Sequence, residues 1–548
     1  MTTRYDISRV PLQGGYVAKQ CPVRAQNDTL VPAEPVPTPP MLRQLFDRGN
    51  DFEAGIIAEM RESVLGCVFI AGHGDDAEAA TLEAMRNEST AIFGARLPSD
   101  FVGRRVGRPD LLVRAAAGGY RPVDIKYHMA IAPHPPGREG MAALLSGLGS
   151  PWRETASVDA LLSAGKSAND LFQLAHYQRM LESVGMAAND GRWGGIIGTE
   201  RQVVWYDLDA PVWRTPSVSQ GTKLRSTMER YDFEFDFRLD IIAVAERCKA
   251  DPAVKLLVVP VKIGECPSCP WWEYCRLQLE KPPGDVSLLP RVGWNEWKTH
   301  QEHGVTNRAL LAALDPLTAR LVTAGIDVAG IQRVAAGFVS ERAVSDLAAV
   351  WTKGKQLERL QDDGVATVGD LRALDTVTAS YAGSGLWGLP EQIDQARAAL
   401  GPAPLYRRRG VSEIDVPRAD IEVDVDMENI WEGCYLWGAW VTDRSGSNIV
   451  PSGYRAFTTW DPMTPEVEAE NSLAFWRWLM RLRADAYDAG LTFCAYCWNA
   501  SAENTYLRRL GIAAGIENDV EAFIASGEWI DLLAVWNRQL ITGGSSGL

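Results

Sequence analysis

The segment GRPDLLVRAAAGGYRPVDIKYH, residues 107–128, decides how the first part of the chain folds. It contains two short apolar runs, DLLVR and PVDIKYH, separated by AAAGGY, and this pattern predicts a β-hairpin. Successive side chains of a strand point to opposite faces, so Asp124 and Lys126 are expected on the same face. Pairing of the two strands brings Asp110 alongside them.

Two carboxylates beside one lysine can hold a divalent cation and orient a water molecule against a phosphodiester. The pattern is short, and the alternative is a solvated hairpin whose salt bridge contributes at most ~1 kcal/mol. A helix is predicted over 171–185, and in it Gln173 and Tyr177 are four residues apart, on one helical face. His176, in the same motif, is interpreted as a packing residue.

The hairpin and the Q-x-x-x-Y helix together resemble the RecB-like branch of the PD-(D/E)xK nucleases. This resemblance implies a restriction-endonuclease-like fold and cleavage that depends on Mg²⁺ or Mn²⁺. It also implies the role of each residue: metal ligation by Asp110 and Asp124, catalysis by Lys126, and support of substrate binding by Gln173 and Tyr177.

One position departs from the pattern of that family. RecB-like nucleases usually carry a metal-binding histidine in a G-x-x-H-E setting on an early helix, which is predicted here over 41–62. The corresponding stretch is GNDFE, with Gly49, Phe52 and Glu53, so phenylalanine stands where histidine is expected. A phenyl ring cannot coordinate a cation. We therefore expect that Glu53 or water completes the metal shell, or that metal affinity and activity are reduced.

Three cysteines lie close together in ECPSCPWWEYC, residues 265–275: Cys266, Cys269 and Cys275. They lack the second C-x₂-C of a zinc ribbon. Iron–sulfur RecB-like nucleases use one cysteine before the nuclease core and three after it, so the resemblance implies Cys21 as the fourth ligand of a 4Fe-4S cluster. Zinc held by the same four cysteines is the alternative.

The remaining cysteines and the two tryptophans of that stretch are given no chemistry. Cys67 and Cys248 are interpreted as buried small hydrophobic residues. The Cys494–Cys497 pair lies in an apolar run, which favours packing over redox chemistry. Trp271 and Trp272 are interpreted as an apolar cover over the cysteine site.

A second set of carboxylates lies in EVDVDMEN, where Asp424, Asp426 and Glu428 alternate with apolar residues and so share one strand face. Like charges on one face are unfavourable unless cations or solvent offset them. Farther on, Asn499 and Glu503 form N-x₃-E at a predicted helix start.

This D-x-E and N-x₃-E order resembles the ribonuclease-H-like DEDD exonucleases. The resemblance implies metal ligation by Asp426, Glu428 and Glu503, while Asp531 is interpreted as structural. The last carboxylate of that family would lie beyond the given sequence, so we expect an incomplete domain. The alternative is an inactive fold that docks substrate.

The stretch between these parts is predicted to be helical, with similar glycine turns at Gly325-Ile326 and Gly364-Val365. These turns resemble helix-hairpin-helix modules, which hold nucleic-acid backbones through turn amides. A helical spacer that ends its helices with C-cap glycines is the alternative.

The chain has 548 residues, a net charge of −15, no twenty-residue apolar span and no apolar secretory segment at its start. This predicts a cytoplasmic α/β multidomain protein without a membrane anchor. The predicted domains are the nuclease domain, a helical helix-hairpin-helix-like linker and an apparently truncated ribonuclease-H-like domain, at 1–285, 286–415 and 416–548.

This order of parts resembles a bacterial family of putative RecB-like nucleases, some continued by a helicase. It implies a metal-dependent DNA nuclease, exonucleolytic on single-stranded ends, in repair or recombination, with a partner or fused helicase. The alternative is a weakly active or inactive nucleic-acid-binding scaffold that docks substrate for the helicase.

Overall fold

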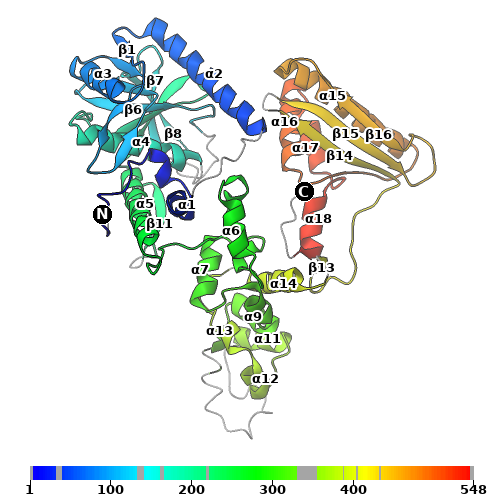
Figure 1. Cartoon of the computed structure of the whole chain (residues 1–548). Coiled ribbons are helices and arrows are strands. Elements are labelled where there is room, and N and C mark those ends of the chain that lie inside the picture. Colours follow the sequence, from blue (N-terminus) through cyan, green and yellow to red (C-terminus); the bar gives the residue numbers. More distant parts are fainter. Residues whose placement is uncertain are drawn as a thin grey trace. The chain divides into compact units, whose positions relative to one another are not determined.

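The computed structural model of the chain (Figure 1) describes residues 4–31, 40–131, 141–160, 166–217, 221–329, 332, 354–386, 388–402, 405–430 and 433–542. The chain forms two compact units, Met1–Gln278 and Leu279–Leu548. In the predicted helical and ribonuclease-H-like domains, the residues outside the described ranges are 330–331, 333–353, 387, 403–404, 431–432 and 543–548.

The first unit is built on an eight-stranded mixed sheet. Its strands follow the order β1-β2-β5-β6-β9-β10-β7-β8. The pairs β1–β2 and β6–β9 are parallel, and the other neighbours are antiparallel. In chain order the strands are β1 Cys67–Phe69, β2 Ala91–Phe93, β5 Leu111–Arg114, β6 Tyr120–Ile125, β7 Met141–Gly147, β8 Glu154–Ala160, β9 Trp193–Ile197 and β10 Gln202–Asp207.

Two hairpins lie outside this sheet, and helices complete the unit (Figure 1). The hairpins are β3–β4 and β11–β12, with strands Leu97–Asp100, Arg105–Gly107, Trp213–Ser217 and Gly221–Arg225. The helices are α1 Pro22–Leu30, α2 Pro40–Ser63, α3 Asp75–Arg86, α4 Lys166–Ser183, α5 Thr227–Ala250 and α6 Trp272–Leu279. The predicted hairpin is confirmed as β5–β6, and the predicted helices over 41–62 and 171–185 are confirmed as α2 and α4.

Alternation along β5 and β6 sorts side chains between two apolar layers. Leu111 and Val113 pack with Ile56 and Met60 of α2, whereas Leu112 packs with Tyr177 of α4. On β6, Val123 and Ile125 belong to the α2 layer and Tyr120 to the α4 layer. Asp124 lies between Val123 and Ile125, so its side chain is directed to the face that carries α4.

The second unit contains a five-stranded sheet of order β16-β15-β14-β17-β18. β14, β17 and β18 are parallel, and β15 and β16 continue the sheet in antiparallel fashion. The strands are β14 Ile421–Asn429, β15 Cys434–Asp443, β16 Gly453–Thr458, β17 Phe493–Cys497 and β18 Trp529–Asp531. A short pair joins β13 Leu405–Arg407 to β19 Leu540–Thr542.

One face of this sheet packs on helices. Val423, Val425 and Met427 of β14 belong to a core that also contains Phe475 and Leu507. The intervening Asp424, Asp426 and Glu428 are exposed, so the prediction that they share one face is confirmed. The helices of this part are α15 Pro465–Asp488, α16 Ser501–Ala514, α17 Glu517–Ile524 and α18 Leu532–Gln539.

The rest of the second unit is helical where it is described, as predicted. Its α-helices are α7 Trp294–Glu302, α8 Arg308–Ala313, α9 Pro316–Thr323, α11 Gly354–Asp362, α12 Val368–Ala373, α13 Thr376–Ala379 and α14 Leu389–Leu400. This helical part contains a glycine turn at Gly304 in addition to the predicted turns at Gly325 and Gly364. The three glycines have φ of +74°, +82° and +86°. This is the left-handed geometry of C-cap glycines.

This helical part also contains a longer repeat that was not predicted from the sequence. GVT at 304–306 and DPLT at 315–318 recur as GVA at 364–366 and DTVT at 375–378. The two copies exchange hydrogen bonds: Asp315 N–H donates to Thr378 Oγ1 at 3.0 Å, and Asp375 N–H donates to Thr318 Oγ1 at 3.1 Å. The repeat is therefore reciprocal, and each copy holds the helix start of the other.

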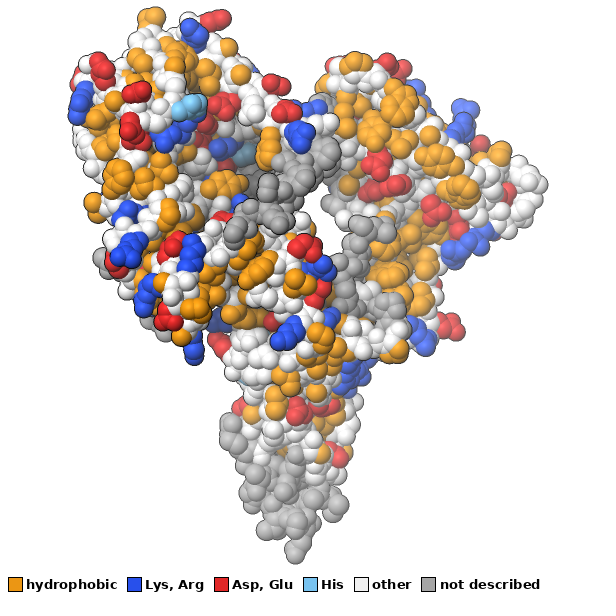
Figure 2. Space-filling view, in the orientation of Figure 1, with side chains coloured by type: hydrophobic (Ala, Val, Ile, Leu, Met, Phe, Trp, Pro, Cys, Tyr) orange, Lys and Arg blue, Asp and Glu red, His pale blue; other side chains and the backbone are white. Residues whose placement is uncertain are grey.

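Among the described residues, no helix is long and apolar enough to cross a membrane. Figure 2 shows acidic and basic side chains interspersed over the face in view.

Candidate active site

Asp124 and Lys126 form an ion pair at the end of β6. The Nζ of Lys126 lies 3.0 Å from Oδ2 of Asp124. The side chain of Asp124 is 0% exposed, so the alternative of a solvated hairpin is wrong for this pair. Within the described part of the chain, Oδ1 of Asp124 is buried and has no hydrogen-bond partner. A buried carboxylate oxygen without a donor is a position that a cation can occupy.

Asp110 lies just before β5 and beside Asp124. Its Oδ2 accepts a hydrogen bond of 2.7 Å from the Ile125 N–H. Burial, and next the charge of Asp124, raise the pKa of Asp110 to about 7. For Lys126, burial lowers the pKa, but the carboxylates of Asp124 and Asp110 outweigh this and raise it above its ordinary value. The three predicted residues therefore form one electrostatic group.

Helix α4 brings Gln173 and Tyr177 to the same site, as their spacing predicts. Gln173 Nε2 donates to the Tyr177 hydroxyl at 2.8 Å, and this hydroxyl donates to the carbonyl oxygen of Arg108 at 3.1 Å. Asp124 and Asp110 both contribute to raising the pKa of Tyr177, after burial, which has the largest effect. The hydroxyl is thus tied to the chain two residues before Asp110.

His176 packs as predicted. Its side chain is 0% exposed, and its ring nitrogens lie 2.7 Å from the Tyr231 hydroxyl and 3.1 Å from the Val106 carbonyl oxygen. Burial lowers its pKa to about 3, which keeps the ring neutral at physiological pH. This residue joins α4 to α5 and β4.

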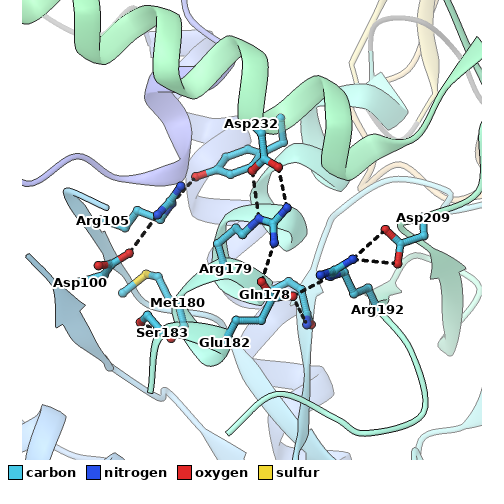
Figure 3. Close-up of polar contacts among 11 residues, drawn as sticks. Asp100, Arg105, Gln178, Arg179, Met180, Glu182, Ser183, Arg192, Asp209 and Asp232 are labelled. Atoms are coloured by element: carbon cyan, nitrogen blue, oxygen red, sulfur yellow. Dashed lines mark hydrogen bonds and ion pairs between the residues drawn. The ribbon is translucent and has the colours of Figure 1, made fainter. Parts of the chain in front are cut away.

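A charged network on the opposite side of α4 fixes the position of this helix (Figure 3). Arg179 holds Asp232 of α5 through two hydrogen bonds, Nε to Oδ1 at 2.9 Å and Nη2 to Oδ2 at 2.5 Å. Arg179 also contacts Glu182, which in turn accepts from Arg192 at 2.6 Å. Bidentate pairs of this kind fix orientation as well as distance.

The structure places Phe52 in an apolar layer and Glu53 near the carboxylates. The ring of Phe52 lies 5.4 Å from that of Tyr127 and packs against the α2 layer. Glu53 contributes to raising the pKa of Asp110. Among the described residues, no group of three or more His, Cys, Asp or Glu side chains is arranged to hold a metal ion.

The fold brings the start of α1 to the cysteine triplet. Trp271 Nε1 donates to Asp28 Oδ1 at 2.6 Å, and Asn27 Nδ2 donates to Cys275 Sγ at 3.6 Å. Cys21 is the N-cap residue of α1. The segment that precedes the eight-stranded sheet therefore packs against the segment that follows it.

The thiols of these two segments influence one another. Burial raises the pKa of Cys275 to about 11, and the next contributions come from Cys21 and Cys269, followed by Cys266. The Ile263 N–H donates to Cys266 Sγ at 3.3 Å. N–H hydrogen bonds to sulfur are a feature of cysteine-held clusters, but within the described part of the chain the four thiols do not form a group arranged to hold a metal ion.

The other cysteines and the tryptophans are placed mostly as predicted. Cys494 and Cys497 are buried, whereas Cys67 and Cys248 are half-buried, so the prediction of full burial is wrong for that second pair. Trp271 is buried and hydrogen-bonded, and Trp272 is half-buried. All nine cysteines lie in the described part of the chain, and none forms a disulfide there.

The second candidate site lies at the carboxyl ends of β14, β17 and β18. Glu503 in the first turn of α16 is 5% exposed, and burial, with smaller effects of Asp426 and Asp531, raises its pKa. Its Oε2 has no hydrogen-bond partner among the residues described. Asp531 caps α18, accepting from Leu533 N–H at 2.9 Å, as its structural interpretation requires.

Glu428 and Asn499 relate to this site differently. Glu428 shares the face of Asp426 but is not among the charges that raise the pKa of Glu503. Asn499 has a φ of +64°, and its N–H donates to Asp531 Oδ1 at 3.2 Å. The charges of Asp426 and Asp531 therefore act on Glu503, whereas the sequence favoured Asp426, Glu428 and Glu503 as ligands.

The sequence analysis missed several polar residues beside the first site. Lys19 Nζ donates to Gln173 Oε1 at 3.0 Å, and His128 Nε2 lies 3.0 Å from Asp170 Oδ2. A cavity of about 520 Å³ is lined by these residues and by Lys126. Lys19 comes from a 3₁₀ turn far from the hairpin, and no local pattern marks it.

Comparisons of the chain with protein families, with curated proteins and with solved structures found no match.

Proposed function

We propose that this protein is a metal-dependent DNA nuclease that acts on single-stranded ends in repair or recombination in the cytoplasm. The observation that carries the proposal is the buried group of Asp110, Asp124 and Lys126. The two carboxylates repel each other, and one of them has a buried oxygen without a hydrogen-bond partner among the described residues. A divalent cation suits such a pair.

Asp110 and Asp124 would hold Mg²⁺ or Mn²⁺. When bound, the cation supplies neutralisation of the charge that builds on the phosphate during displacement. Lys126, whose Nζ lies 3.0 Å from Oδ2 of Asp124, places a second positive charge at the same point. Gln173 and the hydroxyl of Tyr177 provide neutral hydrogen-bonding groups for the substrate strand.

The nuclease hypothesis is tested by measuring cleavage of a labelled single strand in Mn²⁺ by wild type and by Lys126→Ala. The matched control is Lys223→Gln, which removes an exposed lysine in β12. We expect cleavage by wild type and control, and a loss of about 10²- to 10³-fold in Lys126→Ala. No cleavage by wild type, or equal cleavage by Lys126→Ala, contradicts a nuclease at this site.

We propose that Cys21, Cys266, Cys269 and Cys275 hold a 4Fe-4S cluster, with zinc as the alternative occupant. The packing of α1 on the triplet and the shared electrostatics of the thiols support this assignment. A cluster there would join the two ends of the nuclease domain. Metal analysis of anaerobically purified protein distinguishes iron from zinc.

We propose a PD-(D/E)xK-like fold for the first unit and a ribonuclease-H-like fold for the five-stranded part of the second. In the latter, Asp426 and Glu503 are the candidate ligands, with Glu428 or Asp531 as a third. The parallel β14, β17 and β18 with carboxylates at one edge support this reading. Cleavage that persists in Lys126→Ala and disappears with Glu503→Gln would assign activity here.

A second candidate function is a nucleic-acid-binding scaffold that docks substrate for a partner or fused helicase. Phe52, whose ring packs on Tyr127 where the family carries a metal-binding histidine, favours this candidate. The three glycine turns of the helical part also suit backbone binding as helix-hairpin-helix-like modules. Strand binding without cleavage in Mn²⁺ would support the scaffold.

A further inference from the structure

The cavity of about 520 Å³ beside Lys126 has an uneven charge pattern. Three cationic side chains line it, Lys19, Arg24 and Lys126, against two acids, Asp170 and Glu265. Asp170 already lies 3.0 Å from His128. The lining of this cavity, next to the candidate active site, therefore carries more positive than negative charge.

Lys19 is the least compensated of these cations. Its Nζ donates to the neutral amide oxygen of Gln173 at 3.0 Å, and within the described residues no carboxylate lies at ion-pair distance from it. Burial, followed by the charge of Lys126, lowers its pKa to about 8. The charges of Asp170 and Asp124 act in the opposite direction, but among the described residues neither carboxylate forms a direct ion pair with this ammonium group, which is held by an amide.

Arg24 and Tyr16 extend the same wall. Arg24 Nε is buried without a hydrogen-bond partner in the described residues, and its distance to Asp28 Oδ2 is a loose 3.9 Å. Tyr16 is 64% exposed, and Lys19 Nζ lies 5.2 Å from its ring centroid. An exposed ring next to a cationic cavity offers a stacking surface beside a phosphate position.

We infer that Lys19, with Arg24, forms a phosphate subsite that holds the phosphodiester next to the scissile one, and that Tyr16 stacks on the adjoining base. This inference rests on the proposed function. It assigns to these three residues the binding of single-stranded nucleic acid through its backbone and one base, without sequence readout. The hydrogen bond from Lys19 to Gln173 ties the subsite to helix α4 of the active site.

A charge-removing and a ring-removing variant test the subsite on the full chain. Binding of a labelled oligothymidylate is measured over a series of salt concentrations, with Ca²⁺ in place of Mn²⁺ to hold cleavage off. The variants are Lys19→Gln, Lys19→Arg and Tyr16→Ala. The matched control is Lys223→Gln, which removes an exposed lysine away from the cavity.

For Lys19→Gln we expect weaker binding and a slope of log K against log salt that is smaller by about 0.7, the value of one single-strand phosphate contact. Lys19→Arg and Lys223→Gln keep the wild-type slope. Tyr16→Ala weakens binding about tenfold with the slope unchanged, because stacking releases no counterions.

Three results would overturn the inference. A wild-type slope in Lys19→Gln, or a reduced slope in Lys19→Arg, refutes the phosphate subsite even when wild type cleaves in Mn²⁺ and Lys126→Ala does not. Absence of both binding and cleavage in wild type refutes the proposed function together with the subsite. The salt slope separates a phosphate contact from a purely structural role of Lys19, which would not change the number of counterions released.

Discussion

The ammonium group of Lys126 lies 3.0 Å from a carboxylate oxygen of Asp124 that is completely buried, and Asp110 stands next to both. Burying two carboxylates with one lysine leaves one negative charge uncompensated. Burial and the charge of Asp124 disfavour the ionised form of Asp110, and its pKa rises from 3.8 to about 7.

The pKa of Asp110 predicts that stability decreases as pH rises when divalent cations are chelated. Between pH 3.8 and about 7, the folded chain keeps a proton on Asp110 that the unfolded chain has released. The free energy of unfolding is therefore highest at low pH and decreases as the pH rises through this range. The loss is on the order of 2 kcal/mol after allowance for solvent screening. Thermal unfolding of wild type and Asp110→Asn in chelator measures it.

Asp110→Asn should be the more stable protein near neutral pH and should lose this part of the pH dependence. Asp488→Asn, an exposed aspartate at the end of α15, is the matched control. Parallel stability curves for wild type and Asp110→Asn across the acidic range would contradict the raised pKa.

Phe52→His should raise the affinity for Mn²⁺ about tenfold if an imidazole at this position adds a ligand to the proposed metal site. Metal titration followed by calorimetry measures the effect. Phe52→Leu, which keeps an apolar side chain against Tyr127 and adds no ligand, is the control. Equal Mn²⁺ affinity in Phe52→His and Phe52→Leu would show that position 52 does not face the metal.

Cys21→Ser should lower the iron content of anaerobically purified protein and its absorbance near ~400 nm. It should also destabilise the first unit, because the link between α1 and the triplet is weakened. Cys248→Ser, at a half-buried position of α5 outside the quartet, should leave both unchanged. The assignment fails if Cys21→Ser and wild type carry the same iron content.

Arg179→Ala should destabilise the first unit by about 1–2 kcal/mol, because it removes the two hydrogen bonds to Asp232 that fix α4 (Figure 3). It should also slow cleavage, since Gln173 and Tyr177 lie on the same helix. Urea unfolding of Arg179→Ala, Asp232→Ala and the double variant gives the coupling energy of the pair.

The matched control is Arg508→Ala, whose partner Glu521 forms an exposed pair in the second unit. Exposed pairs contribute little, so its effect should stay below about 0.5 kcal/mol. A coupling energy near zero between Arg179 and Asp232 would remove this pair as the support of α4.

Local sequence patterns were enough to predict the geometry of the first site. Period-two alternation placed Asp124 and Lys126 on one face, and the helical spacing placed Gln173 and Tyr177 together. The same alternation predicted the acidic face of β14. These features depend on neighbours within one strand, hairpin or helix turn, where the backbone period alone fixes direction.

The contacts between distant groups became visible in the folded chain alone. The tertiary structure placed Lys19 against Gln173, α1 against the cysteine triplet, and Asp531 rather than Glu428 among the charges that act on Glu503. It also revealed the exchange between Asp315 and Thr378. Such contacts join residues whose separation along the chain carries no periodic signal. They are set by the way whole helices and strands pack, and a local sequence pattern carries no information about that packing.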